Sequence, residues 1–500
     1  MERSDIMATG SINISSNISR NTLLSAYAPK PCKNLTAKAG NGSVVLKWED
    51  PENYTTTDGK EIVWKYTRIV RKTDSYPINE NDGTIVTESS IKSQYKSNGY
   101  TDNGLTNYTT YYYRAFSCST DGVYNHEQVQ VSTQPIPYKV MTVKINLANS
   151  NPANCGSYVD DASTMSSGKD VAAWQEFFGY RPCLFKNGKV VGYLDPTNFT
   201  KFENGTNADI TSGNAGDVMI QFPRRGIRIS KSGKVVTVSM TDNQNDPNFK
   251  YYAHQRGDVD KDYFYLGVYD GWVSENKLRS LSGKYPTVNI SVGNFDQFGK
   301  ANGTGYGYMG YYQWLFLQVM YVLQFKGNLN SQSTVGYGNC ISTGNSIKNT
   351  GRSNTNGMIY GSDNVVKLFG IEDIWGNIWQ SINNYYSNDN YHITTTTDDT
   401  IIDVDKYIDR GSYGHTYANT TRNYYTDCMG TTEAGFSITF YSEGGSSTTY
   451  FCDTGEFVSN KIPSVGGSFS SDDEAGLFCF LVSDTRATSG MASGTRLQYL

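Results

Sequence analysis

Short stretches in the first third of the chain alternate apolar and polar residues. Val44, Leu46 and Trp48 stand at every second position, and a similar pattern returns in residues 61–72 and 105–119. A period of two places one set of side chains on a single face of an extended backbone. Each stretch is therefore predicted to be a half-buried β-strand.

Turn signals that end in glycine separate these predicted strands. Several short strands punctuated in this way predict a β-sandwich, which we place at residues 28–137. The strand containing Trp48, and the position of Leu105 six residues before Tyr111, resemble a fibronectin type III domain. A run with two prolines at 134–140 is interpreted as the linker that follows. The turn signals are Asn41-Gly42, Asp58-Gly59, Asp82-Gly83 and Asp121-Gly122.

Residues 138–500 combine one helical pattern with strand patterns and long loops. Apolar residues occupy the whole helical wheel at 310–325, which predicts a buried core helix. This run is shorter than the ~18 residues that a membrane span needs, so no membrane insertion is expected. Residues 174–196 predict a hairpin that turns at Asn187-Gly188. We therefore predict a mainly β protein with an α+β C-terminal part. Further strands are predicted at 235–240 and 263–269.

The first residues and the net charge narrow the class of protein. Residues 1–27 are polar and rich in Ser and Asn, and they lack the apolar stretch of a secretion signal. We expect them to form an assembly arm that a partner orders. The 43 Lys and Arg against 48 Asp and Glu leave a net charge of −5. Because binding of nucleic-acid phosphates depends on an excess of cations, nucleic acid is not expected as a partner.

Neither the cysteines nor any catalytic motif indicates an enzyme. The cysteines are scattered without zinc spacing, which favours small buried residues in a protein made in a reducing cytoplasm. The sequence contains no nucleophile elbow, His-Glu-x-x-His helix or phosphate-binding loop. A glycan depolymerase stays open, because it needs only two suitably spaced carboxylates. The cysteines are Cys32, Cys118, Cys155, Cys183, Cys340, Cys428, Cys452 and Cys479.

Three ordered segments of the second part resemble one known family. GIEDIWGNIWQ at 370–380 is similar to the core motif of the formylglycine-generating-enzyme type of C-type-lectin fold, in which a strand packs at the centre. Residues 466–500 resemble the closing segment of that family. Residues 311–339 resemble a helix and loop of its phage and prophage members, in which a fibronectin-type domain often comes first.

The resemblance implies a C-type-lectin-like domain at 138–500, similar to receptor-binding proteins that retroelements diversify. The sequence departs from the oxidases of the family in two ways. It lacks their close pair of reactive cysteines, and Trp379-Gln380 stands where Trp-Glu is usual. Formylglycine-generating activity is therefore not expected, and we predict that the protein is not an enzyme.

The resemblance also implies where a binding surface lies. Alternation in the predicted strand 475–483 puts Phe478, Phe480 and Val482 on one face. Periodicity leaves the choice of core face open, because both faces are apolar. The resemblance implies that the phenylalanine face is core and that the opposite face and its flanking loops form a binding segment within 466–500. The predicted ligand-binding residues are Ser471, Asp472, Asp473, Cys479, Leu481, Ser483, Asp484, Arg486, Thr488 and Met491.

Together these features predict a bacteriophage virion adhesin, a tail or fibre protein at the virion surface. It is expected to bind a host-surface glycan or protein and to join other virion proteins through residues 1–27. A head fibre or capsid decoration protein is the first alternative, because it uses the same modules, and a glycan depolymerase is the second.

No cofactor is predicted. The acidic run at 472–474 would offer oxygen ligands to calcium, but the Glu-Pro-Asn signature of calcium-dependent sugar binding is missing from the closing segment. Phage fibres are often trimers, and no heptad or fibrous repeat in this sequence supports that state. Homo-oligomerisation therefore stays open.

Overall fold

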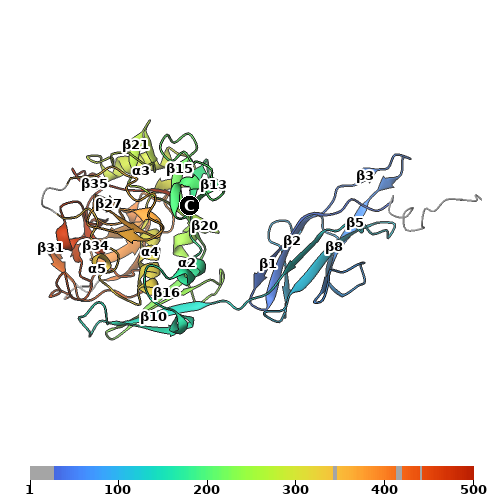
Figure 1. Ribbon diagram of the computed structural model, residues 1–500, viewed down its shortest axis with the longest axis horizontal. Coiled ribbons are helices and arrows are strands. Elements are labelled where there is room, and N and C mark those ends of the chain that lie inside the picture. Colours follow the sequence, from blue (N-terminus) through green and yellow to red (C-terminus); the bar gives the residue numbers. More distant parts are fainter. Residues whose placement is uncertain (1–26, 342–345, 413–418, 440–441) are drawn as a thin grey trace, which may run out of the picture. The chain divides into compact units, whose positions relative to one another are not determined.

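The chain divides into two compact units, Met1–Tyr138 and Lys139–Leu500 (Figure 1). Strands hold 40% of the residues and helices 10%, which confirms the prediction of a mainly β protein. Of the predicted arm 1–27, only Tyr27 lies within the described residues. The computed structural model describes residues 27–341, 346–412, 419–439 and 442–500.

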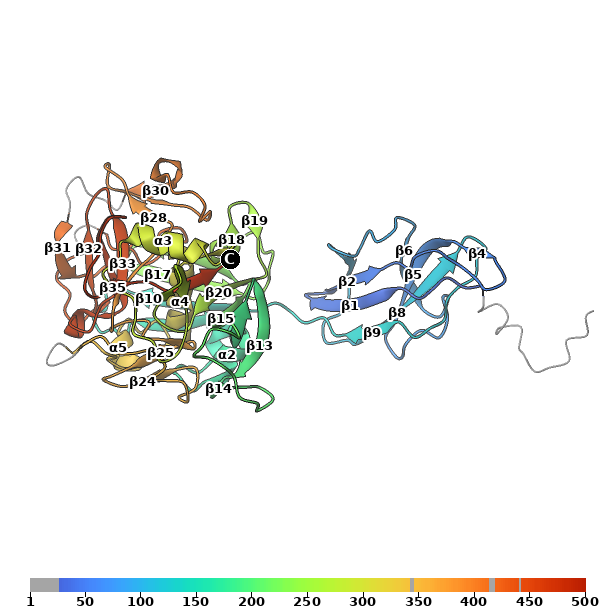
Figure 2. The same cartoon turned by 90° about the horizontal axis from the view of Figure 1, so that it is seen from above.

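The N-terminal unit contains two larger antiparallel sheets, of order β1-β2-β7 and β6-β5-β8-β9, and the small pair β3-β4 (Figure 2). Trp48 of β2 and Tyr113 of β8 are buried in one shared core. The hydroxyl of Tyr111 accepts a hydrogen bond of 3.0 Å from the amide of Thr106, which ties the start of β8 to the loop before it. The strands are β1 (Lys33–Gly40), β2 (Ser43–Glu49), β3 (Tyr54–Thr55), β4 (Glu61–Ile62), β5 (Trp64–Lys72), β6 (Thr84–Ser89), β7 (Tyr100–Asn103), β8 (Tyr111–Ser119) and β9 (Gln130–Thr133).

Three larger sheets and the helix α4 contribute to the main core of the C-terminal unit. The first sheet has the order β11-β10-β17-β16, with β10 (Val140–Asn146), β11 (Gly156–Asp160), β16 (Gly226–Ser232) and β17 (Val235–Thr241). The second has the order β14-β13-β12-β15-β20-β36-β23, with β12 (Arg181–Lys186), β13 (Lys189–Asp195), β14 (Asn198–Phe202), β15 (Asp217–Pro223), β20 (Tyr263–Gly267), β23 (Tyr306–Tyr308) and β36 (Leu497–Tyr499).

The third large sheet is built from strands between residues 379 and 494. Its order is β31-β32-β34-β33-β27-β35, and in Figure 2 the strands β31, β32 and β33 lie together on one side of the C-terminal unit. The strands are β27 (Trp379–Ser381), β31 (Asn419–Tyr424), β32 (Thr454–Phe457), β33 (Ile462–Gly466), β34 (Gly476–Asp484) and β35 (Ser493–Gly494).

Smaller elements complete the C-terminal unit. The short strands are β18 (Gln255–Arg256), β19 (Val259–Asp260), β21 (Trp272–Ser274), β22 (Lys277–Arg279), β24 (Tyr360–Gly361), β25 (Val366–Leu368), β26 (Ile371–Glu372), β28 (Tyr385–Ser387), β29 (His392–Thr395) and β30 (Ile408–Ser412). The helices are α2 (Ala172–Phe178), α3 (Val292–Lys300), α4 (Tyr311–Gln324) and α5 (Ser331–Thr334), with 3-10 turns η1 (Asp161–Thr164), η2 (Tyr252–His254), η3 (Val404–Lys406) and η4 (Asp472–Glu474).

Helix α4 confirms the buried helix predicted at 310–325. Every one of its residues is buried, including three glutamines. Each glutamine donates its amide N–H to a backbone carbonyl of another segment, which removes much of the cost of burying a polar group. No helix of the described residues is both long and apolar enough to cross a membrane. The three hydrogen bonds are Gln313 to Ala253 at 2.7 Å, Gln318 to Leu477 at 3.0 Å and Gln324 to Gly168 at 3.0 Å.

The predicted hairpin also forms. Strands β12 and β13 pair across Asn187 and Gly188, whose φ angles of 52° and 74° are those that an Asn-Gly turn favours. A short strand, Tyr306–Tyr308, lies in the glycine-rich stretch before α4. These residues form β23, because β36 near the C-terminus supplies a partner strand.

The GIEDIWGNIWQ motif is buried, but it is not the strand that was expected. Between β26 and β27 the backbone turns, and Asp373 and Asn377 have positive φ angles of 49° and 59°. Asp and Asn tolerate this left-handed region better than most residues, which is one physical reason for their presence in the motif.

Candidate functional site

Strand β34 lies inside the six-stranded sheet, between β32 and β33. Phe478, Phe480 and Val482 are buried in the main core, as predicted for the phenylalanine face. Leu481 belongs to the other face, and it pairs with Glu456 of β32 and Ser464 of β33. We call this other side the outer face of the sheet.

The prediction that Cys479 and Leu481 are exposed was wrong. Cys479 is 0% exposed and Leu481 is 5% exposed. Side chains of neighbouring strands cover them, because β34 is central: the Thr454 hydroxyl lies 3.8 Å from the Cys479 sulfur. Burial is the main cause that raises the pKa of the Cys479 thiol, and the nearby guanidinium of Arg422 acts in the opposite direction.

Ser471 is also buried, which contradicts its predicted role in the binding surface. It is 7% exposed, and its hydroxyl accepts a hydrogen bond of 2.9 Å from the amide of Ser468. This contact fixes the turn before β34. The neighbouring Asp472 is exposed and Asp473 is half-buried, so these two remain candidates for contact with a ligand.

The loop after β34 packs mainly on α3. The Arg486 carbonyl accepts a hydrogen bond of 2.9 Å from the Gly293 amide, and its guanidinium lies 2.9 Å from Asp296. Ser483, Asp484, Arg486 and Thr488 are half-buried, and Met491 is 81% exposed. Asp484 accepts a hydrogen bond from the Ser464 hydroxyl, and Thr488 accepts one of 2.8 Å from the Thr485 amide. Most of these predicted site residues therefore hold the loop in place.

A cluster of five side chains forms where the predicted residue Asp473 and its neighbour Glu474 meet β31 and β27. Arg422 pairs with Glu474 at 2.6 Å, and its guanidinium carbon lies 5.2 Å from the ring centroid of Trp379. The hydroxyl of Tyr424 donates a hydrogen bond of 2.9 Å to Asp473. We call Trp379, Arg422, Tyr424, Asp473 and Glu474 the outer-face cluster.

The outer-face cluster combines chemistries that suit a binding surface. Burial and the nearby Asp473 carboxylate raise the pKa of the Tyr424 phenol, so this hydroxyl stays protonated as a donor at neutral pH. Arg422 and Glu474 keep side-chain exposures of 35% and 36%, so a partner can reach both charges. Trp379 contributes a half-buried aromatic ring. Cation, carboxylates, phenol and indole together can bind hydroxyl-rich or peptide groups.

Sequence reasoning missed the three members of this cluster outside residues 466–500. Trp379 was noted only as the end of a structural motif, and Arg422 and Tyr424 lie in a segment without any recognisable pattern. A polar strand with Arg and Tyr two residues apart places both side chains on one face, which is the only signal that could have pointed to them.

A buried polar network lies on the inner side of the same sheet. Arg496 is 0% exposed, and it donates hydrogen bonds of 2.7 Å to both Asp270 and Gln380. Asn377 of the motif donates 2.8 Å to the same Asp270 carboxylate. We call these residues the Arg496 network. It also includes carbonyls of Val268 at 2.9 Å, Glu372 at 2.6 Å and Asp373 at 2.7 Å from Arg496.

A second buried carboxylate fixes the start of β34. Asp453 accepts a hydrogen bond of 2.7 Å from the Phe478 amide, and burial holds the pKa of this carboxyl well above its usual range. A β-carbon at Gly476 would overlap the Asp453 carboxylate. The glycine of the Ala475-Gly476 pair is therefore required by the close approach of this side chain.

Among the described residues, no group of three or more His, Cys, Asp or Glu side chains could hold a metal ion. All eight cysteines are unpaired and buried, which confirms their interpretation as small interior residues.

Comparison with known proteins does not assign this chain to a family. No known protein family matches this sequence, and no curated protein is significantly similar to it.

Proposed function

We propose that this chain is a bacteriophage virion adhesin, a tail or fibre protein that binds a host-surface glycan or protein. The observation that carries the proposal is the outer-face cluster, which sets Trp379, Arg422 and Tyr424 beside the predicted residue Asp473 and its neighbour Glu474. The virion setting rests on the resemblance of residues 370–380 and 466–500 to the formylglycine-generating-enzyme type of C-type-lectin fold, and of residues 311–339 to its phage and prophage members.

The residue types in the cluster support a role in recognition. Trp, Tyr and Arg are the residues most enriched among those that dominate binding energy at interfaces. The ion pair of Arg422 and Glu474 pre-orients the guanidinium over the indole ring, so less side-chain entropy is lost when a partner binds. Truncation of one such residue is expected to cost about 2 kcal/mol of binding, a factor of about 30 in affinity.

The remaining parts of the chain fit this role as spacer and anchor. Along the sequence, the N-terminal sandwich, which we propose to be a fibronectin type III domain, lies between residues 1–27 and the C-terminal unit. We propose that residues 1–27 attach the protein to other virion proteins. The C-terminal unit, proposed to be C-type-lectin-like, then presents the cluster to the host.

The test is a competition assay with the purified full-length chain. Wild-type protein should block phage adsorption to host cells in a saturable way, and Arg422→Ala should require at least about tenfold more protein for the same block. The matched control is Arg181→Ala. Arg181 has the same chemistry elsewhere in the unit: it pairs with Glu203 at 2.7 Å and lies 3.5 Å from the ring centroid of Tyr193.

Three outcomes would contradict parts of this proposal. Equal loss of competition with both arginine variants would argue against the outer-face cluster as the binding surface. Immunogold labelling of the capsid instead of the tail would favour the head fibre or decoration protein. Release of sugar from host polysaccharide by the purified chain would favour the depolymerase.

A further inference from the structure

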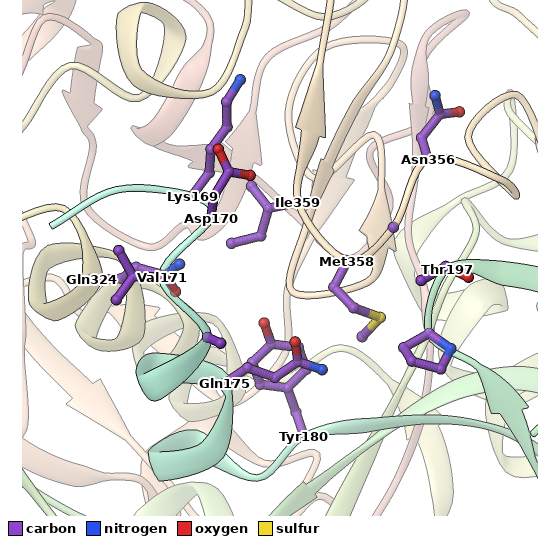
Figure 3. Close-up of a pocket in the computed structure, with 13 residues that line it drawn as sticks. Lys169, Asp170, Val171, Gln175, Tyr180, Thr197, Gln324, Asn356, Met358 and Ile359 are labelled. Atoms are coloured by element: carbon purple, nitrogen blue, oxygen red, sulfur yellow. The ribbon is translucent and has the colours of Figure 1, made fainter. Parts of the chain in front are cut away.

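A pocket of about 300 Å³ opens in the C-terminal unit, built from segments that contribute nothing to the outer-face cluster. Its lining comes from residues 169–175, Tyr180, the loop at 196–197, the end of α4 and residues 356–359 (Figure 3). This volume is at the lower end of the range for small-molecule sites. A ligand that fits must therefore be small.

Tyr180 supplies a hydroxyl that points into this pocket. The residue as a whole is buried, at 2% exposure, and Figure 3 shows its side chain directed toward the hollow. Within the described part of the chain, the Tyr180 hydroxyl makes no hydrogen bond. The ring itself is fixed, with centroids 5.4 Å from Phe369 and 6.1 Å from Phe222. The hydroxyl is thus held in position with its hydrogen-bonding capacity unused.

Gln324 supplies a second polar atom, which is buried at the wall. Its amide nitrogen donates to the Gly168 carbonyl at 3.0 Å, which fixes which end of the amide carries the oxygen. The oxygen, Oε1, is buried and has no hydrogen-bond partner among the described residues. Because Oε1 has almost no exposed surface, it lies behind the pocket wall and adds polarity to that side of the pocket.

The rest of the lining limits the chemistry of the ligand. Met358 and Ile359 form an apolar wall, and Gln175 and Asn356 place neutral amides around the opening. The two charged residues of the rim, Lys169 and Asp170, have opposite signs. The pocket therefore offers hydrogen-bond donors and acceptors without a net charge, beside an apolar surface.

We infer that this pocket binds a single neutral pyranose ring. Ring hydroxyls would exchange hydrogen bonds with the Tyr180 hydroxyl and with the amides of Gln175 and Asn356, and the C–H face of the sugar would pack on Met358 and Ile359. The inference does not depend on the proposed adhesin role. A result at the outer-face cluster leaves this pocket unchanged, and the reverse also holds, because the two sites share no residue.

Saturation-transfer NMR on the full-length chain tests the inference with three probes: methyl α-D-glucopyranoside, methyl α-D-galactopyranoside and N-acetyl-D-glucosamine. At least one probe should bind saturably with a Kd in the millimolar range. Tyr180→Phe removes only the hydroxyl and should weaken that binding about fivefold or more. Tyr285→Phe is the matched control, because Tyr285 is 53% exposed and does not line the pocket.

A blocking variant keeps the test independent of the hydroxyl. Ala172 is exposed at the start of α2 and lines the opening, so Ala172→Trp should fill the mouth without disturbing the core and should abolish binding. Thermal unfolding of each variant checks that the fold is retained. Absence of saturable binding by all three probes at 50 mM (roughly ten times the top of the expected range) would overturn the inference. Binding that survives both Tyr180→Phe and Ala172→Trp would overturn it equally.

Discussion

Two arginines on opposite sides of the six-stranded sheet differ in their exposure to solvent. Trp379 and Gln380 are consecutive residues of β27, so their side chains point to opposite faces. Gln380 accepts a hydrogen bond from Arg496, whose side chain is 0% exposed, and Trp379 lies against Arg422, whose side chain is 35% exposed. One arginine belongs to the interior of the protein and the other to its surface.

The difference shows that an arginine can stabilise the interior in one place and stay accessible to a ligand in another. Arg496 directs its donors at Asp270, Gln380 and backbone carbonyls, so no group remains for a partner. A buried charge is tolerated only when it is paired and hydrogen-bonded in this way. Arg422 is paired but half hydrated, so a ligand can approach it without a large cost of desolvation.

The largest expected effect on stability comes from disrupting the Arg496 network on the inner side of the sheet. Arg496→Met leaves the wholly buried Asp270 without its ion-pair partner, and the free energy of unfolding of the C-terminal unit should fall by about 3–5 kcal/mol. Urea denaturation of the full-length chain, followed by tryptophan fluorescence, measures this change. Arg422→Met is the matched control. A loss below about 1 kcal/mol for Arg496→Met would mean that the network does not stabilise the fold.

A smaller effect is expected where β34 begins. Gly476→Ala places a methyl group on the Asp453 carboxylate and should lower the free energy of unfolding by about 1–3 kcal/mol. The control is Gly293→Ala in α3, where the added carbon has ordinary contact space and the residue is helical, so stability should stay equal or rise. Equal midpoints for both variants in urea would refute the close approach of Asp453.

The smallest effect on stability is expected on the outer side. Arg422→Ala should change the free energy of unfolding by less than about 1 kcal/mol, because exposed ion pairs and cation–π contacts each contribute little. The same variant is expected to lose competition for adsorption. If Arg422→Ala instead destabilises the protein as much as Arg496→Met does, both arginines contribute equally to stability. A loss of binding by Arg422→Ala would then be explained by loss of the fold.

The candidate site was only partly predictable. The closing segment was the right region to examine, and Asp473 and the adjacent Glu474 do lie in the outer-face cluster. Alternation placed Cys479 and Leu481 on the face opposite the phenylalanines, and the family resemblance assigned that face to the binding surface, but both residues are buried. Alternation says which residues share a face, but neighbouring strands decide whether that face is covered.

By itself, the sequence determined the local elements of this protein. The period-two pattern around Trp48 became β2, the apolar wheel at 310–325 became α4, and Asn187-Gly188 became a hairpin turn. These features depend on backbone preferences and on burial within a few residues, so a short window contains the information needed to predict them.

Only the tertiary structure decided which distant residues meet. It brought Arg422 of β31 to Trp379 of β27, inserted β36 between β20 and β23, and closed the Arg496 network around Asp270. The order of strands in a sheet is set by the burial of whole faces in a common core. That order depends on every segment at once, and no single stretch of the sequence contains it.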